Sequence, residues 1–163
     1  MDISAAPLID DALADFVRSE VSITVATCDD DRTPHLARGT GCRVSADQRQ
    51  LNVLLAAPAS AEVLADIGRN ARIAVVFSLP RTHRTLQFKG TDAVITGIEA
   101  GDPELAAQYV DRFATGLEAL GYSGAVIRGV LHADGTELVA VRFTPTFGSL
   151  QTPGPEAGHV LRS

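Results

Sequence analysis

The chain has 163 residues, 45% of them hydrophobic and only 5% aromatic, and its formal net charge is −6. This length and apolar content exclude a wholly disordered chain and allow one domain whose core needs neither a disulfide nor a structural metal. The acidic balance excludes the broadly basic surface that nucleic-acid binding requires. No signal peptide or membrane-spanning apolar run is present, so we expect one soluble, cytoplasmic domain over residues 1–163 without a nucleic-acid or membrane partner.

The first third of the chain predicts one helix followed by three strands. Residues 8–19 place apolar side chains on one helical stripe and aspartates on the other side, as in an amphipathic helix. Residues 21–29 alternate β-branched and polar side chains, residues 34–45 return after an aspartate-rich turn, and residues 51–56 form a more apolar strand. The short turns between these strands favour antiparallel pairing.

The middle of the chain predicts a helix and two further strands. Pro58 suits the first turn of a helix that continues over residues 59–69. Residues 71–78 are rich in β-branched side chains, and residues 84–98 read as one long strand in which Gly90 is a candidate bulge.

The C-terminal part predicts one more helix and one more strand. Asp102 and Pro103 open the helix in the order of a cap followed by a first helical residue. Residues 121–135 are ambiguous between a helical turn and a loop, and residues 137–143 form the last clear strand. The tail from about residue 148 is rich in Gly and Pro, so we expect it to be extended or partly mobile.

The resulting order is helix, three strands, helix, two strands, helix, strand. About six antiparallel strands can close into a small barrel, which removes exposed sheet edges. We therefore predict an α+β domain built around an antiparallel barrel with flanking helices.

Familiar catalytic and metal-binding signatures are missing from the sequence. There is no serine-hydrolase elbow, phosphate-binding P-loop, zinc-protease helix or dinucleotide fingerprint. Cys28 and Cys42 lack the spacing of a zinc site, and we expect both to be buried free thiols. No side chain stands out as a catalytic acid or base, so no catalytic residue and no metal are predicted.

One segment, residues 37–43, combines features of a phosphate site. Arg38 and Arg43 flank Gly39, Thr40 and Gly41. Guanidinium groups bind phosphate through a planar fork of donors, and the missing glycine side chains would let a phosphate approach the backbone. The two arginines face opposite sides of a regular strand unless the glycines introduce a bulge. The alternative is that both arginines are ordinary solvated strand residues.

Two weaker clusters accompany this segment. Arg84, Thr85 and Gln87 supply donors that would lie beside the first cluster if the two strands are neighbours in the barrel; otherwise they form a charged hairpin rim. Ser60 stands at a predicted helix start, where free N–H groups can hold an anion. Many helices begin in this way, so Ser60 alone is a weak signal.

Three stretches of this sequence resemble the pyridoxamine-phosphate-oxidase-like family, the flavin-mononucleotide-binding split barrels. They are PHLARGTGCRV, LNVLLAAPASAEVLADIGRNARIAVVFS and HRTLQFKG, and the likeness runs over about residues 12–98. The resemblance implies a split antiparallel barrel that forms a homodimer, with flavin mononucleotide (FMN) in the cleft between the two subunits. It implies a cofactor site that contains Arg38, Gly39, Thr40, Arg43, Ser60, Arg84, Thr85 and Gln87.

The sequence departs from this family at several positions. Pro58, Ala59 and Ser60 stand where the oxidases carry a Ser-Arg-Lys phosphate clamp, so two positive charges are lost. Thr85 is shorter than the glutamine that it replaces. The tail shows no match to the residues that recognise the vitamin substrate, which argues against oxidation of pyridoxamine phosphate.

These observations leave two functional hypotheses. The first is an FMN-dependent oxidoreductase with an unknown small-molecule substrate, in which the flavin performs the hydride chemistry. The second is a non-enzymatic module that binds or senses flavin or haem on the same fold, with His35 or His83 as candidate haem ligands. The deazaflavin F420 is a third candidate cofactor.

Overall fold

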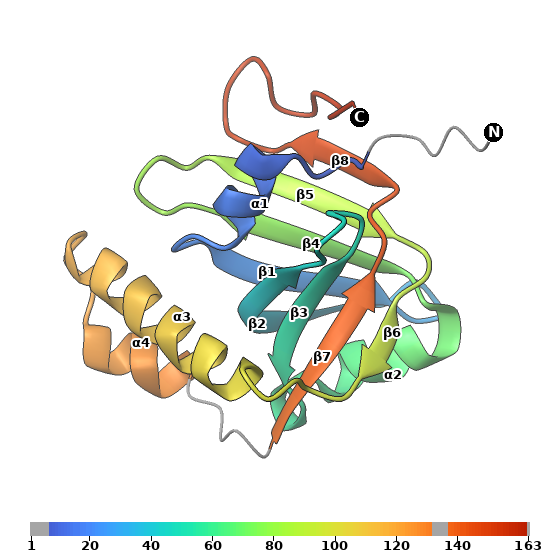
Figure 1. Cartoon of the computed structure of the whole chain (residues 1–163), viewed down its shortest axis with the longest axis horizontal. Helices are drawn as coiled ribbons and strands as arrows, with labels where there is room; N and C mark the ends of the chain where they lie inside the picture. The colour runs from blue at the N-terminus through green and yellow to red at the C-terminus, as the bar shows by residue number, and fades with distance from the viewer. Residues whose placement is uncertain (1–6, 132–136, 163) are drawn as a thin grey trace.

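The computed structural model describes residues 7–131 and 137–162. In chain order the elements are α1 (Asp11–Val17), β1 (Ser22–Cys28), β2 (Pro34–Val44), β3 (Leu51–Ala56), the short 3-10 helix η1 (Pro58–Ser60), α2 (Ala61–Asn70), β4 (Ile73–Ser78), β5 (Thr85–Gly90), β6 (Val94–Thr96), α3 (Asp102–Glu118), α4 (Gly124–Leu131), β7 (Leu138–Phe143) and β8 (Phe147–Leu150). Figure 1 shows their arrangement, with α3 and α4 packed together on one side of the strands.

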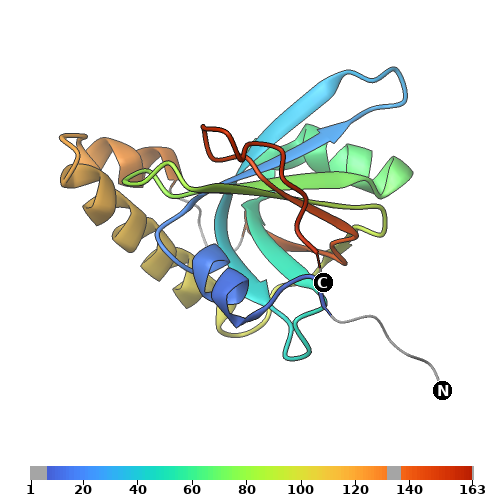
Figure 2. The same ribbon diagram turned by 90° about the horizontal axis from the view of Figure 1, so that it is seen from above.

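The strands form one antiparallel sheet in the order β6-β7-β3-β2-β1-β4-β5-β8. The long strand β2 joins the two halves, because it pairs with β1 through residues 34–38 and with β3 through residues 39–44. The sheet curls around its core and stays open between β6 and β8 (Figure 1). Seen from above, the β1–β2 hairpin extends past the other strands beside α2 (Figure 2). The predicted α+β split antiparallel barrel with flanking helices is confirmed.

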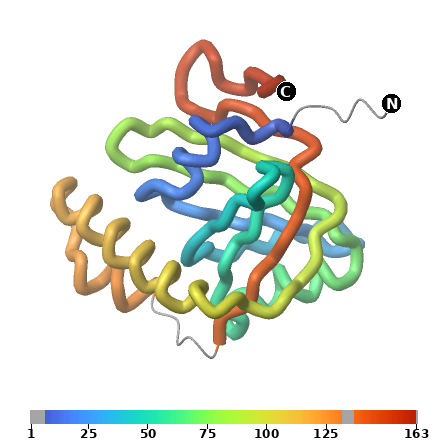
Figure 3. The backbone as a smooth tube through the Cα atoms, in the orientation of Figure 1, coloured from blue at the N-terminus to red at the C-terminus, as the bar shows by residue number. Residues whose placement is uncertain are grey.

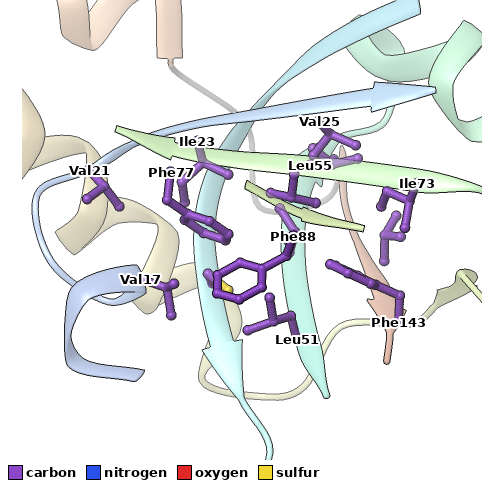
Figure 4. Packing of buried hydrophobic residues seen from close by; sticks show 14 of the residues in the cluster. Val17, Val21, Ile23, Val25, Leu51, Leu55, Ile73, Phe77, Phe88 and Phe143 are labelled. Atoms are coloured by element: carbon purple, nitrogen blue, oxygen red, sulfur yellow. The ribbon is translucent and has the colours of Figure 1, made fainter. Parts of the chain in front are cut away.

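The core lies inside the curl and follows from the alternation of side chains along each strand. In β1 and β4 every second residue is buried, and the residues between them are half-buried on the outer face. Among the described residues, the buried set combines aliphatic side chains with five phenylalanines and Tyr109. Figure 4 shows part of this set meeting inside the curl: Val17, Val21, Ile23, Val25, Leu51, Leu55, Ile73, Phe77, Phe88 and Phe143. Helix α1 contributes Val17, so it closes one end of the barrel.

A bulge interrupts β2 where the two glycines stand. Gly39 lies opposite Leu55 and Gly41 lies opposite Leu54, so one extra residue, Thr40, sits between the two pairs. A Cβ atom on Gly39 would lie 2.5 Å from Ile23 Cγ2, which is closer than packed side chains allow. Beyond the bulge, each residue of β2 therefore faces the side opposite to the one that it would face in a regular strand.

Two elements differ from the sequence prediction because of local chemistry. The first helix begins at Asp11 rather than at residue 8, because the Asp10 side chain accepts a hydrogen bond from Leu13 N at 2.8 Å and caps it. The predicted strand over residues 84–98 divides into β5 and β6. A Cβ atom on Gly90 would lie 2.7 Å from Phe143 Cδ2, so the chain turns close to this ring and β6 pairs with β7.

Two C-terminal segments are more ordered than the sequence alone predicted. Residues 124–131 form the helix α4, whereas positions 132–136 of the ambiguous segment lie outside the described residues. The tail supplies β8 and then doubles back over it (Figure 3): Leu161 N donates to Gly148 O at 2.9 Å, and Leu150 N donates to His159 O at 2.8 Å. None of the described helices has the length and apolar character needed to cross a membrane.

Candidate functional site

Arg38 lies on the outer face of β2, beside a hollow of about 440 Å³. The hollow is bordered by β1, β2, the end of β3, η1 and α4, and its lining residues are Thr24, Leu36, Ala37, Arg38, Thr40, Ala56, Ala59, Val130 and Leu131. Arg38 is the one charged residue among the described residues of this lining. The hollow therefore offers a single guanidinium group beside a mostly apolar surface.

The hydrogen bonds of Arg38 and Thr40 determine which donors remain for a ligand. Arg38 Nη1 donates to Thr24 Oγ1 at 3.2 Å, a neutral contact that directs the side chain without compensating its charge. Thr40 is buried, and its hydroxyl donates to Leu54 O at 3.3 Å. Its proton is thus already engaged inside the protein, which leaves Arg38 as the principal donor.

The start of α2 adjoins the same hollow. Ala59 lines it, and the next residue, Ser60, is buried at the N-terminus of this ten-residue helix. Within the described part of the chain, no side chain caps this end by a hydrogen bond. The N-terminal end of a helix carries partial positive charge and favours anions. Arg38 and the α2 N-terminus are therefore two sources of positive potential beside one hollow.

Arg43 lies on the same outer face as Arg38, because the bulge adds a residue between them. It nevertheless borders a different and larger hollow, between α1 and α3. Its guanidinium is held by carboxylates: Nε donates to Asp102 Oδ1 at 2.6 Å, and Nη1 donates to Glu99 Oε1 at 2.7 Å. The structure therefore does not bring the two arginines into one phosphate-sized space.

Gln87 shares a row with Arg38 on the outer face of the sheet. Arg38, Thr24, Val76 and Gln87 stand opposite one another on β2, β1, β4 and β5. With about 4.8 Å between neighbouring strands, Gln87 lies roughly 14 Å from Arg38 along this row. Gln87 therefore faces the same side of the molecule but does not line the Arg38 hollow.

Arg84 and Thr85 belong to the β4–β5 hairpin, away from the Arg38 hollow. The Arg84 guanidinium lies 4.5 Å from the centre of the Phe16 ring, in a cation–π contact. Thr85 Oγ1 hydrogen-bonds Ser78 Oγ at 2.7 Å. The residues proposed from sequence thus fall into four places: the hollow at Arg38, the hollow at Arg43, the outer face of β5, and the contact of Arg84 with Phe16 of α1.

Solved structures of other proteins share this arrangement of strands and helices. HupZ of Group A Streptococcus superposes with a TM-score of 0.56 at 17% identity, over 92% of this chain and 99% of its own. A putative pyridoxamine 5'-phosphate oxidase from Lactobacillus delbrueckii gives 0.55 at 13% identity, over 90% and 96% of the two chains. An F420 reductase gives 0.54 at 18% identity, over 83% and 94%.

This chain has the pyridoxamine-phosphate-oxidase-like split-barrel fold. The similarity rests on structure, since no protein-family profile and no curated protein sequence matches the chain. The predicted resemblance to these split barrels is confirmed at the level of the fold.

Sequence reasoning missed several residues that line the Arg38 hollow of this split barrel. In the sequence Thr24 is only one polar residue of an alternating strand, although in the structure it is the hydrogen-bond partner of Arg38. Val130 and Leu131 belong to α4, which the sequence pattern did not resolve. Val126 and Val130 are 61% and 73% exposed, so α4 carries apolar side chains on both faces and lacks a clear amphipathic pattern.

The two candidate haem ligands lie outside the lining of the Arg38 hollow. His35 Nδ1 hydrogen-bonds the buried Asp66 at 2.7 Å, where β2 meets α2. His83 is exposed at the tip of the β4–β5 hairpin with a φ of +58°. In this split barrel, His35 is therefore already engaged with a carboxylate, and the structure places neither histidine beside Arg38.

Proposed function

We propose that the chain is a flavin-mononucleotide-dependent oxidoreductase that acts on a small molecule as a homodimer. The observation that carries this proposal is the hollow beside Arg38, where one uncompensated cation and a helix N-terminus border an apolar surface. FMN combines an anionic phosphate with a flat, largely apolar ring system, so its two ends match the two kinds of surface.

The residues of the hollow fit this cofactor in charge and in size. Arg38 would bind the phosphate, and the N-terminal turn of α2 at Ser60 would add its dipole. The apolar residues of η1 and α4 would contact the ring. A volume of about 440 Å³ lies in the range of ordinary small-molecule sites. Bound flavin supplies hydride transfer, and the task of this chain is to hold and orient it.

A second subunit would complete the site on the open side of the sheet. On this face, β1, β4 and β5 carry the half-buried residues Thr24, Val76 and Gln87. Leu36, at the rim of the hollow, is 68% exposed. We place the dimer contact on this face, where Thr85 and Gln87 would reach polar groups of the flavin.

The experiment is a titration of the purified protein with FMN, followed by flavin fluorescence, in wild type and Arg38→Gln. Loss of one charged hydrogen bond costs about 1.5–3 kcal/mol, so we expect binding to weaken roughly 10- to 150-fold. Arg72→Gln removes the same charge from an exposed residue outside the hollow and should leave binding unchanged. If Arg38→Gln binds FMN as tightly as wild type, Arg38 does not bind the phosphate and the proposed site is wrong. If parallel titrations show tighter binding of F420 or haem, that compound replaces FMN as the proposed cofactor.

A binding module without turnover is the second candidate function. It is favoured by the lining of the Arg38 hollow, in which Arg38 is the one titratable group among the described residues. Such a lining can hold a cofactor but offers no acid or base to a reaction. Reduction of bound flavin by NADH or NADPH, followed as loss of its visible absorbance, separates the two: bound flavin that stays oxidised supports the module.

A further inference from the structure

The larger hollow, between α1 and α3, has a volume of about 720 Å³ and an unusual concentration of positive charge. Arg18 follows the last residue of α1, Arg43 comes from β2, Arg112 from α3 and Arg142 from β7. Four separate elements thus direct an arginine to the border of one space. This concentration stands out in a chain whose net charge is −6.

Three of these guanidinium groups are uncompensated. Among the described residues, the side chains of Arg18, Arg112 and Arg142 have no ion pair and no hydrogen bond, whereas Arg43 is held by Asp102 and Glu99. Like charges around one hollow repel each other, and an anion bound between them would relieve this repulsion. Arg43 is held by its two carboxylate partners and is not free to bind a ligand. The guanidinium groups of the other three arginines remain available to one.

The remaining residues of the lining indicate what the uncharged part of such a ligand would contact. Asn52 and Gln108 add neutral amide groups, while Val44 and Leu105 add apolar contacts. Glu99 is the one acidic residue among the described residues of the lining, and its carboxylate is engaged by Arg43. Three dispersed cations match two or more anionic groups better than they match one.

We propose that this hollow binds a small organic molecule that carries at least two negative charges, as phosphate or carboxylate groups. Its described lining shares no residue with the hollow beside Arg38, so the site is separate from the proposed flavin site and does not depend on it. Its size lies within the range of metabolite-binding sites.

The test is isothermal titration calorimetry of the full chain with pyrophosphate and with citrate at constant ionic strength, since exposed charges are screened by salt. Both probes carry several negative charges, on phosphate groups in one and on carboxylate groups in the other, and they also differ in shape. We expect saturable binding of at least one of them, and the better probe identifies phosphate or carboxylate as the preferred group. No saturable binding of either probe at millimolar concentration would overturn the proposal.

Substitutions locate the binding. Arg112→Gln and Arg142→Gln each remove one exposed guanidinium and should weaken the affinity about tenfold, the value of one charge-assisted hydrogen bond. Arg72→Gln changes the net charge equally at a remote position and should have no effect. If all three variants bind alike, the interaction is non-specific and the site is rejected. Arg142→Gln should bind FMN with the same affinity as wild type. A loss of anion binding in this variant can then be distinguished from a failure of the flavin proposal.

Discussion

Arg43 donates two hydrogen bonds to Asp102, through Nε at 2.6 Å and Nη2 at 3.1 Å, although 58 residues separate them along the chain. Asp102 is 1% exposed and also accepts a hydrogen bond from Glu99 N at 2.8 Å. The pair therefore fastens the outer face of β2 to the first turn of α3. It also explains why Arg43, although it faces the same side as Arg38, is occupied within the protein.

Asp102→Ala should destabilise the protein by about 2–4 kcal/mol, because it leaves a partly buried guanidinium without its main partner. Urea unfolding at neutral pH measures the effect. Glu99→Gln is the comparison, since the Glu99 side chain is 70% exposed and a surface pair of this kind contributes about 0–1 kcal/mol. Equal losses in the two variants would contradict the view that burial makes Asp102 the stronger anchor.

The glycine bulge yields a second prediction. Gly39→Ala would place a Cβ atom 2.5 Å from Ile23 Cγ2 and 3.1 Å from Val53 Cγ1, so we expect a loss of about 1–3 kcal/mol from overpacking. Gly68→Ala is the matched control, because its Cβ would meet nothing within 4 Å and it lies inside the helix α2, in the last turn. There the substitution should stabilise by about 0.5–1 kcal/mol. Urea unfolding should therefore shift in opposite directions for the two variants, and a shift in the same direction would contradict this account of the bulge.

Strands β1 to β5 and β7 could be predicted from the sequence because their signal is local, whereas β6, β8 and the order of the strands within the sheet could not. The alternation of Val21, Ile23 and Val25 with polar residues is itself the pattern of a strand with one buried face, and the short turns dictate antiparallel neighbours. Gly39 and Gly41 also indicated where β2 could bulge, and the structure has the bulge between them. Elements whose pattern depends on tertiary contacts, such as α4 against α3, could not be resolved in this way.

The candidate site was harder to predict because it depends on which partners each arginine finds. Arg38 and Arg43 look equivalent in the sequence, yet one meets the neutral Thr24 and the other meets two carboxylates. The acid that engages Arg43 most closely, Asp102, appeared in the sequence only as a helix cap. Long-range pairing of charges leaves no local pattern, so the separation of the two arginines required the fold.

The two cysteines should differ in reactivity. Burial raises the pKa of the Cys42 thiol to about 12, against weaker opposing effects of Arg18 and Arg43, so almost none of it is thiolate near pH 8. Cys28 is only half-buried at the end of β1. A thiol reagent such as DTNB should modify Cys28 in the native protein and both cysteines after unfolding. Rapid modification of Cys42 in the folded Cys28→Ser variant would contradict the packing of β2 against the core.

The last prediction concerns the buried cluster that joins the β1–β2 hairpin to α2. Asp66 is fully buried and accepts hydrogen bonds from Thr27 Oγ1 at 2.8 Å and His35 Nδ1 at 2.7 Å, while Arg69 pairs with its other oxygen at 2.9 Å. The hydrogen bond to Asp66 raises the pKa of His35 above 6.5. Burial alone would raise the pKa of Asp66, but the bonds and charges of His35, Thr27 and Arg69 outweigh it and lower the value below 3.8.

These two shifts set the pH range over which the cluster stabilises the fold. A raised histidine pKa contributes stability that is complete below about 6.5 and is lost as the pH rises through the folded-state value. A lowered aspartate pKa contributes stability that is complete above about 3.8 and is lost as the pH falls through its folded-state value. The cluster should therefore contribute most between about pH 4 and pH 6.5 and decline on both sides.

His35→Gln should remove the decline on the alkaline side, because the substituted side chain does not titrate. The measurement is the free energy of urea unfolding at a series of pH values from 4 to 9, with His159→Gln as a control at an exposed histidine. The control should keep the wild-type profile. A His35→Gln profile with an undiminished alkaline decline would show that the decline arises elsewhere, and the ionised His35–Asp66 pair would then have no part in holding α2 to the hairpin.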